Sequence, residues 1–452
     1  MAESSESFGD ALPDQTPPGP GGLPLVGNSL DLYRDAWGFY AELAEYGDVV
    51  AYSALGNDFT ALLHPDYVEQ VLLTDHDQYG KWGFESIGSD FGAEGLVQTE
   101  GEQWRRQRTI VQDAFTMERI REYADTMGAD VRAAVDNWDD GEEIALDERF
   151  SRLTLRILTR SLFDMDLEGG AGQVAELTEV VEARTDINSL TAMAPLWLPL
   201  PSNRRFKRVQ SEFESFVEAL IEQRRGSAEE YDDLLSLLLA GTDESGQGMT
   251  DVEIRDQMST FLFAGHETTS LALTYACMEL ATRPALCERL RSEYEECIDG
   301  RTPSFEELLR LTETERVIKE TLRLYPPAYI IFREAGDDVA VGDYRVPAGT
   351  KLTLPQFWIH RDERFYDDPE QFRPDRWTED FEDDLHDYAY FPFGGGPRHC
   401  IGMRFAMLEL KTALATILPA VAFELISDPD PAFSFGVTLR PREPVRVRVE
   451  KR

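Results

Sequence analysis

The sequence predicts a mainly α-helical protein with a small β region. Helical periodicity prevails from about residue 100 to residue 325, and short runs rich in β-branched and aromatic residues lie nearer the two ends. The longest helical pattern starts at Thr250 and Glu253, whose spacing forms a capping box, and it stops before Pro284. A helix of roughly 32 residues rises about 48 Å. We therefore expect this helix to cross a whole domain.

The second helix and the strands are predicted by the same kind of signal. Ser304 and Glu307 form another capping box, and Pro326 ends the helical pattern that follows it. Strands are expected in four stretches: Val49–Leu55, Thr60–Leu63, Val339–Val346 and Val445–Val449.

The N-terminal residues 1–22 are acidic and rich in serine, then rich in proline and glycine, and we expect a flexible tail. They contain no apolar run as long as a signal peptide or a membrane span, which predicts a protein without a membrane anchor. The four cysteines (Cys277, Cys287, Cys297 and Cys400) fit a reducing, cytoplasmic compartment better than a disulfide framework.

The charge of the chain is extreme, with 85 acidic and 44 basic residues and a net charge of −41. Such a charge repels itself and destabilises a compact state at low ionic strength. Molar salt shortens the Debye length to about 3 Å and removes most of this penalty. We therefore expect adaptation to a salt-rich cytoplasm, as in halophilic archaea. An acidic surface for a partner is the alternative, and the sign of the charge disfavours nucleic-acid binding.

The segment Phe393–Gly402, FGGGPRHCIG, carries the most specific signal. Its cysteine, Cys400, follows three glycines, which allow the backbone to bend tightly and lie close to a flat cofactor. A cysteine held by backbone N–H groups at a helix start is a candidate thiolate ligand. Thiolate is also the axial ligand that favours O–O cleavage at haem iron. A buried structural cysteine is the ordinary alternative, and the spacing of the surrounding residues argues against it.

The segment Ala264–Thr269, AGHETT, interrupts the apolar pattern midway along the longest helix. Its polar residues exclude a membrane span, and Ser270 stands where a paired-histidine zinc motif needs a second histidine. Thr268 can hydrogen-bond within the helix or to a ligand, and Glu267 beside it can supply protons through water. A kinked core helix with a buried polar pair is the alternative.

Two other segments combine arginine with an acidic or aromatic residue. Glu320 and Arg323 share a helix face, and a later segment, FRPDRW, brings Arg376. Trp104 and Arg108 lie one helical turn apart on one face. The planar guanidinium of arginine suits carboxylates. Exposed ion pairs and a solvated basic face are the alternatives.

Together these four segments resemble those of the cytochrome P450 family, in the family's order and over the chain from about Pro17 to its end. The resemblance implies the cytochrome P450 fold, built as a single domain over residues 23–452. It also implies a haem-thiolate monooxygenase with haem b as its cofactor. Such an enzyme activates dioxygen with two electrons and inserts one oxygen atom into an organic substrate, by hydroxylation or epoxidation.

The resemblance also assigns roles to single residues. Cys400 is the expected iron ligand, and the pair Glu267 and Thr268 is expected to deliver protons to dioxygen. Gly265 is expected to leave room for dioxygen, and Ala264 beside it is expected to belong to the same catalytic segment. The other expected haem-binding residues are Trp104, Arg108, Arg333, Phe393, Arg398 and Gly402, with the arginines and Trp104 directed to the propionates. A buried charge cluster that supports the haem-side core without taking part in the chemistry is expected from Glu320, Arg323 and Arg376.

The substrate regions of the family fall on mostly apolar, aromatic or small residues here, in the segments 79–96, 192–201, 326–332 and 433–439. An apolar pocket binds an apolar small molecule by burying its surface, so we expect such a substrate. Fatty acids, terpenoids and steroid-like molecules all remain open.

The electron donor is expected to be a separate protein, because the sequence ends at Arg452, shortly after the family's last strands. We expect a ferredoxin with its reductase, docking on a basic patch of Arg105, Arg106, Arg404 and Lys411. The alternative is a haem-thiolate protein that acts as a peroxygenase, isomerase or gas sensor without a reductase partner. The presence of both an acid and an alcohol on the long helix argues against that alternative.

Overall fold

The computed structural model describes residues 12–54, 56–82, 91–166, 170–186, 195–226, 231, 233–243, 246–300 and 302–452. By its contacts the chain divides into two units. The first comprises Met1–Trp82, Ile330–Ile359 and His386–Arg398, and the second comprises Gly83–Tyr329, His360–Leu385 and His399–Arg452. The expected tail of residues 1–22 lies half outside the described residues, and the expected single domain of residues 23–452 stays a prediction.

The first unit is built on a five-stranded sheet with the strand order β1-β2-β8-β5-β3. The strands are β1 (Val49–Ala54), β2 (Asn57–Leu62), β8 (Lys351–Pro355), β5 (Ile330–Ala335) and β3 (Tyr79–Gly80). β8 runs parallel to β2, and the other neighbours are antiparallel. The register pairs Val49 with Leu62 and Phe332 with Thr353.

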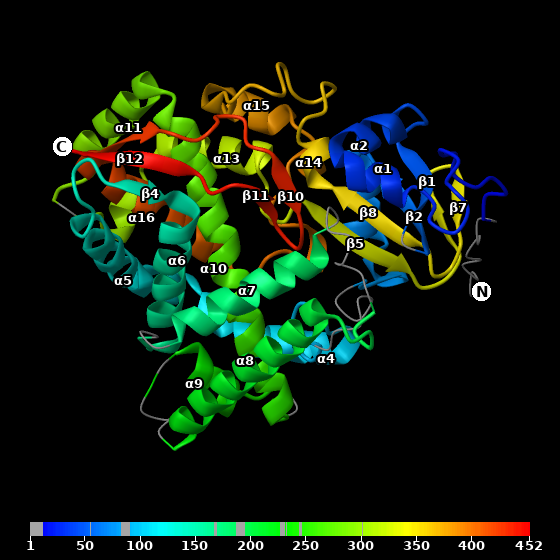
Figure 1. The fold of residues 1–452 in the computed structure, drawn as a ribbon, viewed down its shortest axis with the longest axis horizontal. Helices are drawn as coiled ribbons and strands as arrows, with labels where there is room; N and C mark the ends of the chain where they lie inside the picture. The colour runs from blue at the N-terminus through cyan, green and yellow to red at the C-terminus, as the bar shows by residue number, and fades with distance from the viewer. Residues whose placement is uncertain are drawn as a thin grey trace, which may run out of the picture. The chain divides into compact units, whose positions relative to one another are not determined.

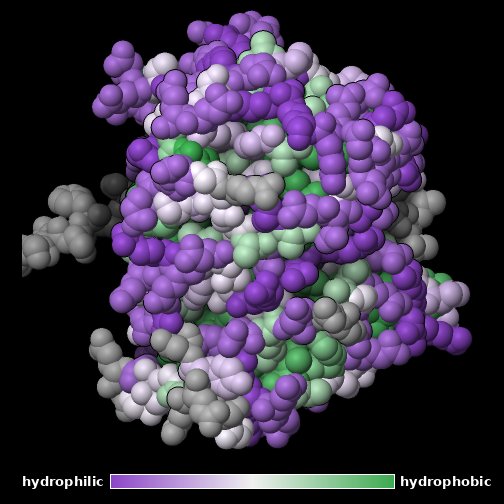
Figure 2. Space-filling view, turned by 90° about the vertical axis from the view of Figure 1, so that its left-hand side faces the viewer, coloured by the Kyte–Doolittle hydropathy of each residue, from purple (hydrophilic) through white to green (hydrophobic). Residues whose placement is uncertain are grey.

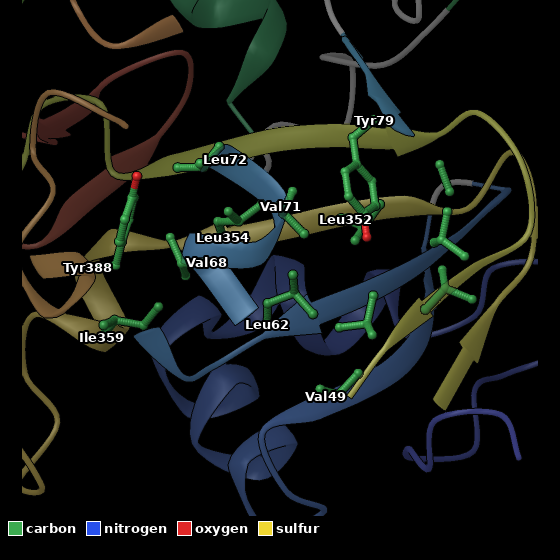
Figure 3. Close-up of a cluster of buried hydrophobic side chains, with 14 of the residues drawn as sticks. Val49, Leu62, Val68, Val71, Leu72, Tyr79, Leu352, Leu354, Ile359 and Tyr388 are labelled. Atoms are coloured by element: carbon green, nitrogen blue, oxygen red, sulfur yellow. The ribbon is translucent and has the colours of Figure 1, made fainter. Parts of the chain in front are cut away.

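Both faces of this sheet are buried, as the alternation of side chains along a strand requires. On one face, Val49, Leu62, Leu352 and Leu354 pack with residues of the short helix α3 (Pro65–Glu69) and the π-helix η1 (Gln70–Thr74) that continues it (Figure 3). On the opposite face, Tyr52 stacks on Phe59 and meets Phe39 of α2 (Ala36–Ala44) edge to face.

The remaining elements of the first unit are short: α1 (Ser29–Arg34), η2 (His76–Gln78), β6 (Val339–Val341), β7 (Tyr344–Val346), α14 (Gln356–Ile359), η7 (Asp387–Ala389) and η8 (Gly396–Arg398). The stretch Val339–Val346, expected as one strand, is a hairpin of β6 and β7. Its chain reverses at Gly342, whose φ of 55° is readily adopted only by a residue without a Cβ atom.

The second unit is mainly helical. Its helices are α4 (Gly101–Val111), η4 (Gln112–Phe115), α5 (Met117–Asp136), α6 (Leu146–Phe163), α7 (Ala171–Thr185), α8 (Pro201–Arg225), α9 (Leu234–Ala240), α10 (Asp251–Ala281), α11 (Pro284–Cys297), α12 (Phe305–Leu308), α13 (Thr312–Leu324), η6 (Pro374–Arg376), α15 (Glu379–Asp384) and α16 (Met403–Ala420). Two small sheets accompany them, one of β4 (Glu143–Ala145), β12 (Arg446–Lys451) and β9 (Val421–Leu425), the other of β10 (Phe433–Phe435) and β11 (Leu439–Pro441).

The long helix α10 forms the centre of this unit and packs against α6, α8, α13 and α16 (Figure 1). It starts where the sequence predicts, because the side chain of Thr250 accepts from the backbone N–H of Glu253 while that of Glu253 accepts from the backbone N–H of Thr250. Most of its residues are buried, and a helix that is enclosed on all sides belongs to the core of a large protein.

The helix that carries Glu320 starts later than its sequence signal indicates. The capping box of Ser304 and Glu307 is present, but it caps only the short helix α12. The next helix, α13, begins at Thr312, because the carboxylate of Glu293 on α11 accepts from the backbone N–H groups of residues 313 and 314 at 2.7 and 3.0 Å. A side chain from another helix thus satisfies the first N–H groups of α13.

No helix among the residues described is both long and apolar enough to cross a membrane. The face of the molecule in Figure 2 is mostly hydrophilic, with smaller apolar areas between the polar side chains. This surface agrees with the excess of acidic residues in the sequence.

Candidate active site

Cys400 lies on a loop of the second unit, two residues before Gly402, which is the N-cap residue of α16. The surrounding protein desolvates the thiol and raises its pKa, whereas the backbone N–H groups of Gly402 and Met403 and the guanidinium of Arg108 act in the opposite direction. N–H groups aimed at sulfur from a helix start stabilise a thiolate. This donor set therefore fits a metal-ligating cysteine.

The glycines before Cys400 belong to the first unit, and the structure shows why they are needed. A Cβ atom on Gly396 would lie 1.8 Å from the backbone oxygen of Leu72, and one on Gly395 would lie 2.3 Å from a ring carbon of Tyr388. Gly396 also has a φ of 62°. The loop thus packs tightly against η1 and η7, which holds its backbone in place.

The segment Ala264–Thr269 lies near the middle of α10. The hydroxyl of Thr268 donates to the backbone oxygen of Ala264 at 2.9 Å, a bond that occupies the hydroxyl within the helix. A Cβ atom on Gly265 would lie 2.8 Å from the side chain of Leu158 on α6. Gly265 thus allows α6 to pack closely on α10, and its expected role in leaving room for dioxygen stays a prediction.

Glu267 is almost fully buried, with 2% of its side chain exposed, and its charge is met by an arginine that the sequence analysis missed. The Nε atom of Arg440 on β11 lies 3.2 Å from one carboxylate oxygen, and Nε2 of His266 lies 3.8 Å from the other. Burial lowers the pKa of His266, so this imidazole is the neutral neighbour and Arg440 the charged one. A buried carboxylate needs a cation, but no sequence signal says that it comes from residue 440.

Trp104 and Arg108 are both carried by α4, as expected. One guanidinium nitrogen of Arg108 donates to the backbone oxygen of His399 at 3.2 Å, and the other lies 3.4 Å from Nε2 of the same histidine. The structure thus brings α4 next to the loop of Cys400.

Arg333, Phe393 and Arg398 belong to the first unit, on β5, on the glycine loop and on η8. Arg333 is buried and donates to the backbone oxygen of Phe332 at 2.8 Å. Each of these residues thus lies on a segment held by the core of that unit.

Glu320, Arg323 and Arg376 form a buried ion cluster in the second unit. The side chains of Glu320 and Arg323 are 0% exposed and share two hydrogen bonds of 2.8 and 2.9 Å. Arg376 donates to Glu320 at 3.1 Å, and the indole N–H of Trp377 donates to it at 2.9 Å. The guanidinium of Arg323 also donates to three backbone oxygens, those of residues 360, 369 and 371. The cluster therefore ties α13 to the segment 360–377.

The basic patch expected to receive the electron donor is only half exposed. Arg105 on α4 and Arg404 on α16 are exposed. Arg106 forms an ion pair with Glu253, at the start of α10, and Lys411 is buried and pairs with Glu315 at 2.7 Å. The pairing of these two cations leaves Arg105 and Arg404 as the exposed members of the patch.

Comparisons with known proteins agree with this site. The model of the cytochrome P450 family matches residues 17–449. The cyclooctat-9-en-7-ol 5-monooxygenase of Streptomyces melanosporofaciens is 34% identical over 88% of this chain and 87% of its own. The pentalenene oxygenase of Streptomyces avermitilis is 34% identical over 88% of this chain and 89% of its own.

The fold has a close counterpart among solved structures. Cyanobacterial CYP120A1 with bound retinoic acid superposes with a TM-score of 0.87 and 25% identity, over 98% of this chain and 100% of that one. The FGGGPRHCIG loop, the acid–alcohol pair on α10 and the buried ion cluster thus occur in a chain that the family model matches almost from end to end. The chain belongs to the cytochrome P450 family and is a haem-thiolate monooxygenase with haem b as its cofactor.

Proposed function

We propose that this monooxygenase hydroxylates or epoxidises a cyclic terpenoid, with electrons from a separate ferredoxin and its reductase. The observation that carries the substrate class is the similarity to two bacterial enzymes named for oxidising cyclooctat-9-en-7-ol and pentalenene, each 34% identical over 88% of this chain. The apolar, aromatic residues around β10 agree with it: Phe433 packs against Tyr275, and Phe435 against Tyr329. A hydrocarbon substrate is held by burial of apolar surface.

In this proposal, Cys400 binds the haem iron, and Trp104, Arg108, Arg333 and Arg398 bind the propionates. Phe393 and Gly402 complete the loop around the cysteine. The haem supplies the activation of dioxygen. Arginine suits the propionates because its planar guanidinium pairs with both oxygens of a carboxylate.

The protein's part in the chemistry is to position the substrate and to move protons. Thr268 offers a hydroxyl on α10, which can exchange its bond to the oxygen of Ala264 for one to a ligand or water. Glu267, the residue before Thr268 on the helix, holds or releases a proton, and its burial allows it to act without contact with bulk solvent.

A titration of the haem Soret band with three substrate classes tests the substrate proposal. Cyclic terpene hydrocarbons and alcohols should displace the water on the ferric iron at lower concentration than fatty acids or steroids of similar size. Turnover with ferredoxin, its reductase and a reduced nicotinamide should then give a product one oxygen atom heavier. Tighter binding and turnover of a fatty acid or a steroid would contradict the terpenoid class and leave the reaction type standing.

The docking of the ferredoxin is proposed on Arg105 and Arg404, the exposed members of the basic patch. Rim charges of this kind set the rate of encounter with an acidic carrier. Arg404→Glu should slow reduction of the haem at low salt and leave substrate binding unchanged. Lys207→Glu, an equal change of charge on an exposed residue of α8, is the matched control. Equal reduction rates for these two variants would exclude this patch.

We also propose that the protein works in a salt-rich cytoplasm. The net charge of −41 and the hydrophilic surface in Figure 2 support this proposal. Activity of the purified enzyme that falls steadily from low to molar potassium chloride would contradict it.

A further inference from the structure

We propose that Glu182 is a positioning residue for Glu267, and that its charge determines how tightly Arg440 holds the Glu267 carboxylate. The inference rests on the proposed role of Glu267 in proton delivery. It concerns two buried carboxyl side chains, on α7 and α10, and the partly exposed Arg440 on β11 of the second unit.

The first step is that Glu267 is bound to Arg440 and not to its neighbour on the helix. Its carboxylate lies 3.2 Å from Nε of Arg440, while the hydroxyl of Thr268 donates to the oxygen of Ala264. Neither carboxylate oxygen has a hydrogen bond of good geometry among the described residues. The acid is thus held by charge alone, and a change in the charge of Arg440's surroundings changes the hold.

The second step is that another carboxyl group interacts electrostatically with the same guanidinium, without an ion pair to it among the described residues. Glu182 on α7 is buried and accepts from the hydroxyl of Thr438 at 2.9 Å, two residues before Arg440. A Cβ atom on Gly436 would lie 2.1 Å from one of its oxygens, so glycine is needed there for this side chain to reach the chain between β10 and β11. The next turn of α7 adds a bond from the backbone N–H of Val437 to the hydroxyl of Thr185.

The third step is a surplus of acid around one cation. Burial lowers the pKa of Arg440, but Glu267, Glu182 and Asp147 at the start of α6 together raise it. Desolvation, together with the charge of Glu267, raises the pKa of Glu182 to about 7 against the opposing effects of Arg440 and Thr438. Desolvation also raises the pKa of Asp147. One guanidinium does not compensate two buried carboxylates and the partly exposed Asp147, so Glu182 binds a proton near neutral pH.

The other charged groups near Glu182 have partners of their own or stay neutral. Glu179, one turn earlier on α7, forms two hydrogen bonds of 2.9 Å with Arg205 of α8. His266 is kept neutral by burial, and Tyr275, which donates to the oxygen of residue 439 at 2.8 Å, has a pKa raised well above its usual range. Glu182, whose pKa burial raises to about 7, is therefore the group to which we assign the change of charge near pH 7, and Asp147 is the other acid of the cluster with a raised pKa.

The consequence is a switch in the hold on Glu267. When Glu182 is protonated, Arg440 is left to Glu267 and pins it. When Glu182 is ionised, its negative charge also attracts the guanidinium of Arg440. The ion pair between Arg440 and Glu267 then weakens, and the carboxylate of Glu267 can turn toward Thr268. Proton delivery should therefore improve as the pH rises through about 7.

Two measurements on the haem-loaded enzyme test this inference. The first is an infrared titration of the protonated carboxyl band, which does not depend on turnover. The parent should lose one buried carboxylic acid with a midpoint near pH 7, and Glu182→Gln should lack this step. Thr438→Val, which deletes the hydrogen bond that favours the ionised form, should move the midpoint up by about one pH unit.

The second measurement is the yield of product per pair of electrons across the same pH range. The parent should show a rise at the infrared midpoint, Thr438→Val a rise at its higher midpoint, and Glu182→Gln a flat profile. Glu179→Gln, on the same helix, is the matched control and should keep the parental step. Arg440→Lys should retain the step because it keeps the charge, and Arg440→Gln should abolish it.

The outcomes separate the two levels of the argument. An infrared midpoint near 4.5, the ordinary value for glutamate, or a parental infrared titration in Glu182→Gln, would overturn the assignment of the proton. A product yield that does not change with pH at the infrared midpoint would overturn the positioning role of Glu182. If Glu267→Gln and Thr268→Ala leave the yield unchanged, the proposed function of the acid–alcohol pair fails, and the infrared result is unaffected by that failure.

Discussion

The buried cluster around Glu320 should be the most sensitive electrostatic element of the fold, and Arg323→Ala is the change that shows it. Arg323 makes two hydrogen bonds to Glu320 and three to backbone oxygens, with none of its side chain exposed. Removing it leaves a buried carboxylate with only Arg376 as its charged partner. It also strips the oxygens of His360 and Pro369 of this donor.

The size of the effect follows from these contacts. Breaking a buried ion pair costs about 3–5 kcal/mol, and each buried oxygen left without a donor costs about 1–3 kcal/mol. The total of about 5–11 kcal/mol is close to the whole stability of a typical domain, about 5–15 kcal/mol. Arg323→Ala should therefore give little folded, haem-loaded protein.

A graded series makes the test quantitative. Trp377→Phe removes one hydrogen bond to the charged Glu320 and should lower the free energy of unfolding by about 1.5–3 kcal/mol. Arg208→Ala, the control, removes exposed pairs with Glu212 and Glu176 and should leave the free energy of unfolding almost unchanged. Haem content, near-ultraviolet circular dichroism and denaturant unfolding measure each step. Parental haem content and stability in Arg323→Ala would refute the reasoning.

Four other predictions follow from the site and the charge. Cys400→His should lose the strongly red-shifted Soret band of the reduced carbon-monoxide complex, and a band that stays shifted would rule out the thiolate assignment. Thr268→Ala should keep haem and substrate binding but divert electrons to peroxide, which equal product yields in variant and parent would disprove. The unfolding midpoint should rise steeply from low to molar potassium chloride, and a flat profile would mean that the charges are compensated within the fold. The pKa of Glu182 is raised from 4.5 to about 7 in the folded state, so protonated Glu182 stabilises the fold fully below pH 4.5. This contribution, roughly 3 kcal/mol in all, is lost as the pH rises to about 7. The free energy of unfolding of Glu182→Gln should not show this decrease with pH.

Structural features that depend only on residues close together in the sequence could be predicted from the sequence. The capping box of Thr250 and Glu253 starts α10 as expected, and the helix ends at Ala281, shortly before Pro284. The FGGGPRHCIG loop was recognisable for the same reason, since a short run of residues carries both the bend and the ligand. Such signals need no knowledge of the rest of the fold.

Features that depend on contacts between distant segments could not be predicted. The capping box of Ser304 and Glu307 was read as the start of the helix of Glu320, but α13 is started by the side chain of Glu293. The Arg440 partner of Glu267 and the Thr438 partner of Glu182 come from a hairpin far along the chain. Nothing in the local pattern of those residues marks them as members of an acid cluster, because the folded chain alone brings them together.

The contact between Gly265 and Leu158 couples two positions that are far apart in the sequence. A methyl group added at Gly265 would lie 2.8 Å from the side chain of Leu158 and collide with it. The side chains at these two positions therefore share one limited space. Relatives with alanine at the position of 265 should therefore carry a smaller residue at that of 158. For an engineer who reshapes this part of α10, the pair must be varied jointly: Gly265→Ala alone should displace the helix, while Gly265→Ala with Leu158→Val should leave it in place.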